Sequence, residues 1–175
     1  MPFIETSIPD LLIFEPNVWK DDRGYFFESY NANTFASAGL NYHFVLDNEA
    51  KSTKGVLRGL HFQKGETAQA KLVRVTEGEV YDVAVDMRPN SATYGQWCGL
   101  ILSAENKRQF LVPRGFAHGY LVMSETAVFN YKCDNFYNKA TEGGLRYNDP
   151  KIGVDWPKLD VPYQLSPKDE EWALL

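Results

Sequence analysis

The chain has 175 residues, a length that a single domain with one hydrophobic core accounts for, and we expect one domain over residues 1–175. Its formal net charge of −5 argues against binding to duplex nucleic acid, which requires a basic surface, but leaves room for a local basic pocket. No segment reaches the roughly 20 apolar residues of a membrane span. The first residues, with Glu5 and Asp10, do not resemble a signal peptide. Because Cys98 and Cys133 lie among apolar neighbours, we expect free thiols and a cytoplasmic protein.

Short runs of β-branched and aromatic residues, separated by Gly, Asn, Asp and Pro, predict many short strands. In chain order these are 11–13, 24–30, 41–48, 55–62, 70–76, 79–86, 96–102, 109–112, 117–122 and 127–133. A short helix is expected over 32–39, and a second one begins at Pro167 with Ser166 as its N-cap. Because so many strands must hide their edges, we predict an all-β jelly roll or small barrel with its site at the interior mouth.

Two strands carry a polar residue on an apolar face. Alternation places Lys71 on the face of two valines, and Tyr131 on the face of Phe129 and Cys133. A lysine at the start of a strand commonly extends its ammonium to the rim, and an inward tyrosine is most often a core aromatic with a satisfied hydroxyl. The functional alternative is a cation that stabilises a developing negative charge, beside a proton donor.

The segment 55–63, GVLRGLHFQ, is an apolar strand interrupted by Arg58 and His61. The two residues are three positions apart, so a regular strand would direct them to opposite faces. If both line one pocket, the strand must contain a bulge or a kink, and Gly59 is the expected place for it. We therefore predict irregular backbone at 59–60, with His61 facing the interior.

The segment 113–118, PRGFAH, is a rigid turn that delivers His118 into the next strand. Together the two segments resemble the cupins, jelly-roll proteins whose second motif, Pro-x-Gly-x-x-His, is complete here. The first motif, His-x-His, is present only as His61-Phe62-Gln63, and Lys71 stands near the place of a carboxylate ligand. Because a metal site needs three or four converging neutral or anionic ligands, we expect no metal.

A histidine base, a lysine cation and a tyrosine acid suit the abstraction of a proton next to a carbonyl group. The cation stabilises the enolate, and the acid returns a proton to the opposite face. These steps amount to an epimerisation that needs no cofactor. The residues alone leave this as one hypothesis among several.

Over nearly its whole length the chain resembles the dTDP-4-dehydrorhamnose 3,5-epimerase family. The matching blocks are DDRGYFFESY, VLRGLHFQ, AQAKLVRVTEGEVYDVAVDMR, SAENKRQFLVPRGFAHGYLV, YKCDNFY, NDPKIGVDWP and LSPKD. The resemblance implies a homodimeric jelly roll with exchanged N-terminal strands. It also implies conversion of dTDP-4-dehydro-6-deoxy-D-glucose to dTDP-4-dehydro-L-rhamnose by inversion of C3 and C5, a step in dTDP-L-rhamnose biosynthesis for cell-surface polysaccharides.

The same resemblance implies roles for four residues. His61 is the proton-abstracting base, and Asp169 is the carboxylate that orients its imidazole. Tyr131 returns a proton, and Lys71 stabilises the enolate oxygen. Asp169 also fits a capping box with Ser166, and the two roles are compatible.

Further positions match residues with which the family binds its substrate. They are Arg23, Glu28, Asp47, Asn48, Arg58, His118, Tyr137, Glu142 and Lys168. Arg58 matches a sugar or diphosphate contact, for which a guanidinium is suited, and Arg23 and Glu28 match nucleotide contacts supplied partly by the neighbouring subunit. Asp47 and Asn48 match base and ribose contacts, His118 a substrate contact, and Glu142 and Lys168 outer contacts. Tyr137 either stacks on the thymine or has an ordinary packing role.

One position departs from the family. Leu46 stands where many relatives have glutamine, which removes an amide worth about 1 kcal/mol if it makes a hydrogen bond. Three other functions remain open at this point: an epimerase or ketoisomerase acting on a single centre, a metal-dependent cupin, and a non-catalytic module that binds sugar nucleotides.

Overall fold

The computed structural model describes residues 2–175. Its longer strands are β5 (Leu46–Thr53), β6 (Leu57–Gln63), β7 (Lys71–Glu77), β8 (Glu79–Asp86), β9 (Trp97–Ser103), β10 (Gln109–Val112), β11 (Phe116–Val122) and β12 (Thr126–Cys133). Its short strands are β1 (Phe3–Glu5), β2 (Leu12–Phe14), β3 (Trp19–Asp21), β4 (Gly24–Phe26) and β13 (Glu142–Gly144). Within these residues the α-helices are α1 (Ala32–Ser37) and α2 (Pro167–Glu171), and single 3-10 turns span Gly65–Thr67 and Lys139–Thr141.

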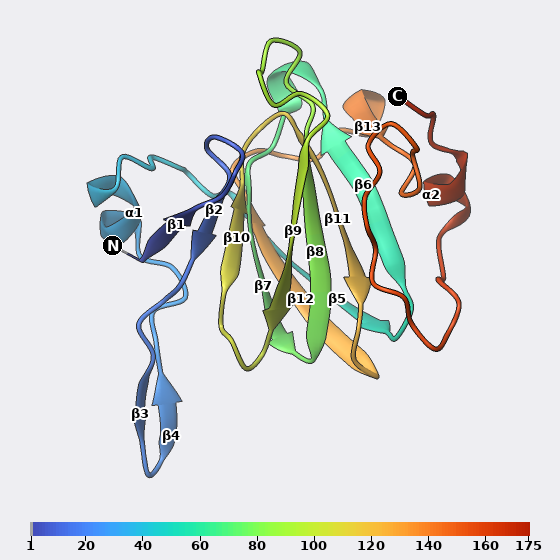
Figure 1. Cartoon of the computed structure of the whole chain (residues 1–175). Helices are drawn as coiled ribbons and strands as arrows, with labels where there is room; N and C mark the ends of the chain where they lie inside the picture. The colour runs from blue at the N-terminus through green and yellow to red at the C-terminus, as the bar shows by residue number, and fades with distance from the viewer. Residues whose placement is uncertain (1) are drawn as a thin grey trace.

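Two antiparallel sheets form the body of the protein (Figure 1). The six-stranded sheet has the order β1-β2-β10-β7-β12-β5, and the five-stranded sheet has the order β13-β6-β11-β8-β9. Strands far apart in the sequence are neighbours in each sheet, as in a jelly roll, which confirms the predicted fold class. The sheets do not close into a continuous barrel, because β1, β5, β9 and β13 remain edge strands.

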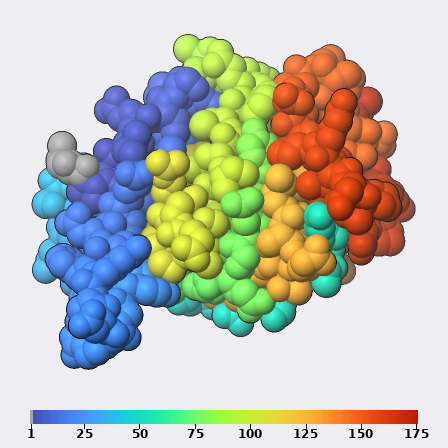
Figure 2. Space-filling model, turned by 60° about the horizontal axis from the view of Figure 1, so that its bottom comes forward, coloured from blue at the N-terminus to red at the C-terminus, as the bar shows by residue number. Residues whose placement is uncertain are grey.

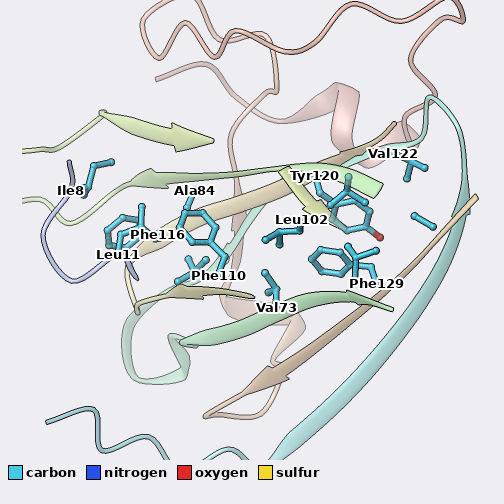
Figure 3. Packing of buried hydrophobic residues seen from close by; sticks show 14 residues of the cluster. Ile8, Leu11, Val73, Ala84, Leu102, Phe110, Phe116, Tyr120, Val122 and Phe129 are labelled. Carbon is cyan, nitrogen blue, oxygen red and sulfur yellow. The ribbon is translucent and has the colours of Figure 1, made fainter. Parts of the chain in front are cut away.

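The main core lies between the two sheets. Val73, Phe110 and Phe129 come from the six-stranded sheet, while Ala84 and Tyr120 come from the five-stranded sheet. Figure 3 shows the Tyr120 ring beside the Phe129 ring, and their centroids are 4.0 Å apart in a stacked arrangement. This packing fixes the relative positions of the facing strands. The same strands carry the polar residues at the open end of the sandwich.

The predicted strand 41–48 is wrong in its position, because β5 begins at Leu46 and continues to Thr53. All eight residues of β5 pair with β12. In its second half, exposed Glu49 and Lys51 alternate with inward Ala50 and Ser52. An edge strand with one solvated face needs few large apolar residues, so its sequence signal is weak.

The predicted strand 24–30 is too long, because β4 ends at Phe26, and its partner β3 was not predicted. The β3–β4 hairpin projects from the body in Figures 1 and 2. Its side chains Trp19, Tyr25 and Phe26 are 56%, 57% and 67% exposed. A two-stranded hairpin has little stability of its own, and in the described residues these large aromatic side chains remain uncovered.

The C-terminal residues 145–175 cover the outer face of the five-stranded sheet, as the orange and red segment in Figure 1 shows. Leu145 and Trp156 pack on a cluster that includes Leu57 and Leu121. The backbone N–H of Leu57 donates to the carbonyl oxygen of Gln164 at 2.9 Å. This attachment brings α2 to the open end of the sandwich.

The helix α1 covers the outer face of the six-stranded sheet. Its Phe35 packs in a cluster with Phe14, Leu72 and Leu111. The helix begins at Ala32 as predicted but ends at Ser37, two residues before the expected stop. Within residues 2–175, neither helix is long and apolar enough to cross a membrane.

Asp86 holds the loop between β8 and β9. Its buried carboxylate accepts hydrogen bonds from Arg88 Nε at 2.9 Å, Arg88 Nη2 at 2.8 Å, the Ser91 hydroxyl at 2.6 Å and the Thr93 hydroxyl at 2.7 Å. Burial alone would raise the pKa of Asp86, but these hydrogen bonds hold it well below its usual range. The carboxylate is therefore ionised in the folded state at every ordinary pH.

Replacing this carboxylate by an amide is expected to lower the free energy of unfolding by about 3 kcal/mol at pH 7, because a buried, hydrogen-bonded ion pair with Arg88 is broken. A depressed pKa stabilises the fold above the unfolded-state value near 3.9 and loses that effect as the pH falls. Urea unfolding of wild type and Asp86→Asn should therefore differ less at pH 3 than at pH 7. The exposed Glu105→Gln variant is the control, and an equal gap at both pH values would contradict the assignment.

Candidate active site

The strand β6 contains a bulge between Arg58 and His61. His61 pairs with His118 and Arg58 pairs with Tyr120, so three steps along β6 oppose two steps along β11. Because alternate residues of β11 share a face, Arg58 and His61 also lie on one face, and both line the same cavity. The predicted irregularity at 59–60 is confirmed, and the Gly59–Leu60 peptide bond is cis.

Gly59 is required at this bulge for two reasons. Its φ of +140° lies in a region that side chains disfavour. A Cβ atom added to it would lie 2.5 Å from the Cα of Gly119 on β11. Likewise, a Cβ atom added to Gly119 would lie 2.6 Å from the carbonyl oxygen of Arg58. The two glycines let β6 and β11 approach closely where the strand changes the direction of its side chains.

A cavity of about 530 Å³ opens between the sheets and the C-terminal segment. Seven residues singled out in the sequence line it: Arg58, His61, Lys71, His118, Tyr131, Lys168 and Asp169. Within the described part of the chain its lining has three cationic side chains and one carboxylate. An acidic protein thus has a locally basic cavity, which suits an anionic ligand.

His61 and Asp169 form a close pair on one wall of the cavity. The Nε2 of His61 lies 2.5 Å from Oδ1 of Asp169. Asp169 is buried, and Ser166 caps its helix by accepting the Asp169 backbone N–H at 3.3 Å. Burial opposes ionisation, but the hydrogen bond and charge of His61 bring the pKa of Asp169 below its usual value. The carboxylate therefore accepts a hydrogen bond from Nε2–H, which leaves Nδ1 as the basic nitrogen.

Lys71 and Tyr131 stand on the opposite wall, on β7 and β12 of the six-stranded sheet. Their strands are paired, with Tyr131 opposite Val73 and Cys133 opposite Lys71. Burial lowers the pKa of Lys71 and raises the pKa of Tyr131. Lys71 is thus a poorly solvated cation, and Tyr131 stays protonated at neutral pH, as an acid must.

A second group of predicted residues lies at the rim of the cavity. Lys168 of α2 forms an ion pair with Glu142 of β13, and the Tyr137 hydroxyl donates to Glu142 at 3.2 Å. On the cavity wall, Arg58 donates from Nε and Nη2 to the Ser52 hydroxyl at 3.2 and 3.1 Å. Arg58 and Lys168 both line the cavity, and Glu142 and Tyr137 are joined to it through Lys168.

Six predicted binding residues are not among those that line this cavity: Glu142 and Tyr137, which are joined to it through Lys168, and Arg23, Glu28, Asp47 and Asn48. Arg23 lies in the projecting hairpin and pairs with Asp21, while Glu28 accepts from Asn31. Asp47 points away from the core and pairs with Lys132 at 2.7 Å. Asn48 pairs with Tyr131 and shares its face, but lies beyond the lining residues. Their roles in binding stay predictions.

Asp82 is a buried residue that the sequence analysis missed. The Nε2 of His118 lies 2.8 Å from its Oδ1, while its Oδ2 has no hydrogen-bond partner among residues 2–175. An aspartate in the middle of the apolar run 79–86 was the available signal, because a buried carboxylate needs a partner. Asp82 therefore orients the His118 imidazole, as Asp169 orients the imidazole of His61.

The donor set of a metal-binding cupin is not assembled here. Among residues 2–175, no group of three or more His, Cys, Asp or Glu side chains is placed to hold a metal ion. His61 and His118 are cross-strand neighbours, yet each contacts its own aspartate, and Lys71 lines the same cavity. That catalysis needs no metal or cofactor remains a prediction.

Residues 5–175 match the family described as dTDP-4-dehydrorhamnose 3,5-epimerase. The chain belongs to this family. It is 56% identical to the dTDP-4-dehydrorhamnose 3,5-epimerase of Salmonella typhimurium, over 100% of this chain and 96% of that protein. The crystal structure of the enzyme from Elizabethkingia anophelis superimposes with a TM-score of 0.94 at 56% identity, covering 98% of this chain and 94% of that one.

A further relative, described as a dTDP-6-deoxy-D-glucose-3,5-epimerase, bears a ligand. The 3,5-epimerase of Legionella pneumophila, solved in complex with dTDP-4-keto-L-rhamnose, has a TM-score of 0.94 and 50% identity, and covers 98% of this chain and 91% of that chain. Membership in this epimerase family makes the chain an isomerase. The basic cavity between the two sheets is consistent with an enzyme that acts on an anionic substrate.

Proposed function

We propose that this chain converts dTDP-4-dehydro-6-deoxy-D-glucose to dTDP-4-dehydro-L-rhamnose in dTDP-L-rhamnose biosynthesis. One observation carries the proposal: the His61–Asp169 pair and Tyr131 line the same cavity from opposite sheets. Inversion at a carbon requires that a proton leaves from one face and returns to the other. A base and an acid on facing walls provide that arrangement.

His61 takes the proton. With Nε2 bonded to Asp169, Nδ1 accepts the proton from C3 or C5, and the imidazolium that forms is stabilised by the ionised carboxylate. The electron pair of the broken C–H bond moves into the ring and places negative charge on the C4 oxygen. Both carbons flank C4, so a single site for this oxygen serves both inversions.

Lys71 stabilises that oxygen. Its ammonium lies in the cavity, where burial makes it poorly solvated, and within residues 2–175 it has no carboxylate partner within 4.0 Å. A preorganised cation of this kind interacts more strongly with a charge that develops in the transition state than with the neutral ketone.

Tyr131 completes the reaction. Its hydroxyl, kept protonated by burial, donates a proton to the carbanionic carbon from the face opposite His61. The resulting phenolate regains a proton from solvent, and the imidazolium releases one, so the enzyme returns to its initial state. The sum of these steps is a change of configuration with no net transfer of protons.

Arg58, Lys168 and His118 bind the substrate. The guanidinium of Arg58 and the ammonium of Lys168 line the cavity and suit the charged oxygens of a diphosphate. Asp82 orients the His118 imidazole for a contact with the substrate. Glu142 and Tyr137 complete the outer contacts at the rim.

We also infer a homodimer of one-domain chains in the cytoplasm. The exposed aromatic side chains of the β3–β4 hairpin support an exchange of N-terminal strands, because a second copy would cover them. Such an exchange would carry Arg23 and Glu28 to the partner's nucleotide, with Asp47 and Asn48 near its base and ribose. Sedimentation of the purified chain as a monomer would contradict the dimer.

The function is tested by incubating the purified chain with dTDP-4-dehydro-6-deoxy-D-glucose and determining the product configuration by NMR. We expect inversion at both C3 and C5, at a rate that EDTA leaves unchanged. Inversion at one carbon would instead assign a single-centre epimerase, and loss of turnover in EDTA a metal-dependent cupin. Binding of dTDP without any turnover would assign a non-catalytic module.

A further inference from the structure

The buried carboxylate Asp169 belongs to a helix that cannot hold its own position. The helix α2 has five residues, and an isolated helix of that length is not stable in water. It follows residues 145–165, which contain no helix and no named strand. The place of Asp169 beside His61 therefore depends on contacts that α2 makes with the sheet.

Besides the Asp169–His61 hydrogen bond and the Lys168–Glu142 ion pair, Trp172, which directly follows α2, packs against the sheet. Its indole lies on the backbone of Gly144 in β13, where an added Cβ would be only 2.2 Å from the indole Cε2 and 2.3 Å from Cδ2. Gly144 has no positive φ, so the glycine is needed here for space and not for conformation. In the sheet, Gly144 pairs directly with His61.

The indole is also close to the reacting groups. Its centroid lies 6.2 Å from the His61 ring in an edge-on arrangement, and the Lys168 ammonium lies 5.7 Å from it. Arg146 Nε donates to the Trp172 carbonyl oxygen at 3.2 Å. The indole N–H is buried without a hydrogen-bond partner among residues 2–175, so packing on the glycine fixes the ring.

We propose that Trp172 is a positioning residue, which by seating its indole on Gly144 holds α2 so that Asp169 meets His61. The proposal rests on the function proposed above for the His61–Asp169 pair. No atom of Trp172 needs to touch the sugar, because the indole acts through Asp169. A displacement of the carboxylate by about 1 Å is enough to lower turnover by roughly 10²-fold.

The test is a mutant cycle at the contact. Trp172→Ala and Gly144→Ala should each lower kcat by roughly 10²-fold with KM changed little, the first by removing the anchor and the second by displacing the ring. In the Trp172→Ala background, Gly144→Ala should cause no further loss, because no ring remains to collide with. The control is Leu174→Ala, which removes a 51% exposed side chain from the same tail.

Two further readouts separate positioning from folding and from the proposed function. Because the hydrogen bond and charge of His61 lower the pKa of Asp169, displacement of α2 should return the pKa of this carboxyl toward its usual value, which NMR titration of the carboxyl measures. The hydrogen-bonded imidazole proton, assigned by NMR through its loss in Asp169→Ala, should also disappear in Trp172→Ala, and this readout needs no activity. Trp172→Phe, which keeps an aromatic ring, should restore both signals in part.

The proposal is overturned if Trp172→Ala retains wild-type kcat and the imidazole proton. It is also overturned if Gly144→Ala is equally harmful with and without the indole, because the glycine would then serve another purpose. If the wild-type chain converts no sugar while the imidazole proton depends on Trp172, the positioning stands and the proposed reaction fails. If Trp172→Ala does not fold, the graded losses in Trp172→Phe and Gly144→Ala decide the result.

Discussion

Replacement of His61 by asparagine is expected to lower kcat by about 10²–10⁴-fold, the contribution of a positioned general base. Asparagine approximates the size of the imidazole and still hydrogen-bonds Asp169, but it cannot accept a proton from carbon. The affinity for dTDP should stay within about twofold, because the loss is confined to the transition state. Steady-state kinetics and calorimetric titration with dTDP measure the two quantities separately.

His43→Asn is the matched control, since His43 is exposed and lies outside the cavity. It should have wild-type kinetics. A His61→Asn variant with wild-type kcat would remove His61 from the mechanism. A variant that instead loses dTDP affinity, with no turnover in wild type, would favour the binding module.

Lys71→Met should lower kcat by about 10²–10³-fold, the usual effect of removing one group that stabilises a developing oxyanion. Methionine keeps the length and the apolar stem of lysine, so packing between β7 and β12 is retained. Because burial lowers the pKa of Lys71, the cation is lost as pH rises at a lower pH than for an ordinary lysine. Wild-type kcat should therefore fall on the alkaline side, and the methionine variant should lack that component.

Lys51→Met serves as the charge control, because Lys51 is exposed on β5 and pairs only with Glu77 in the described chain. It should retain wild-type kcat at all pH values tested. If Lys71→Met had the kcat of this control, the Lys71 ammonium would have no part in catalysis and would only extend to the rim of the cavity, the alternative given for it above.

Much of the fold follows from local patterns. The expected strands at 79–86 and 109–112 match β8 and β10, because they are runs of apolar residues buried on one or both faces. The edge strand β5 and the three-residue strands β1, β3 and β13 gave little signal, since pairing with distant partners, not composition, defines them. The sequence predicted a jelly roll or small barrel, and the two sheets form a jelly roll that keeps four edge strands.

The site was predictable where a residue violates its local pattern. Lys71, Tyr131 and the pair at Arg58 and His61 interrupt apolar strands, and all four line one cavity. The resemblance, not the pattern, supplied Asp169, because a carboxylate in the first turn of a helix looks like a cap. Trp172 and Gly144 left no local signal, since their contact joins segments that only the fold brings together.

The central claim is that His61 removes a proton from one face and Tyr131 returns one from the other. Its most direct test is the fate of deuterium in D2O with wild type and Tyr131→Phe, read by NMR at C3 and C5. In wild type, deuterium should appear at both carbons with inverted configuration. In Tyr131→Phe, it should appear with the original configuration, because only His61 can return it. Wild-type inversion in Tyr131→Phe, or no deuterium at either carbon in wild type, would contradict the account.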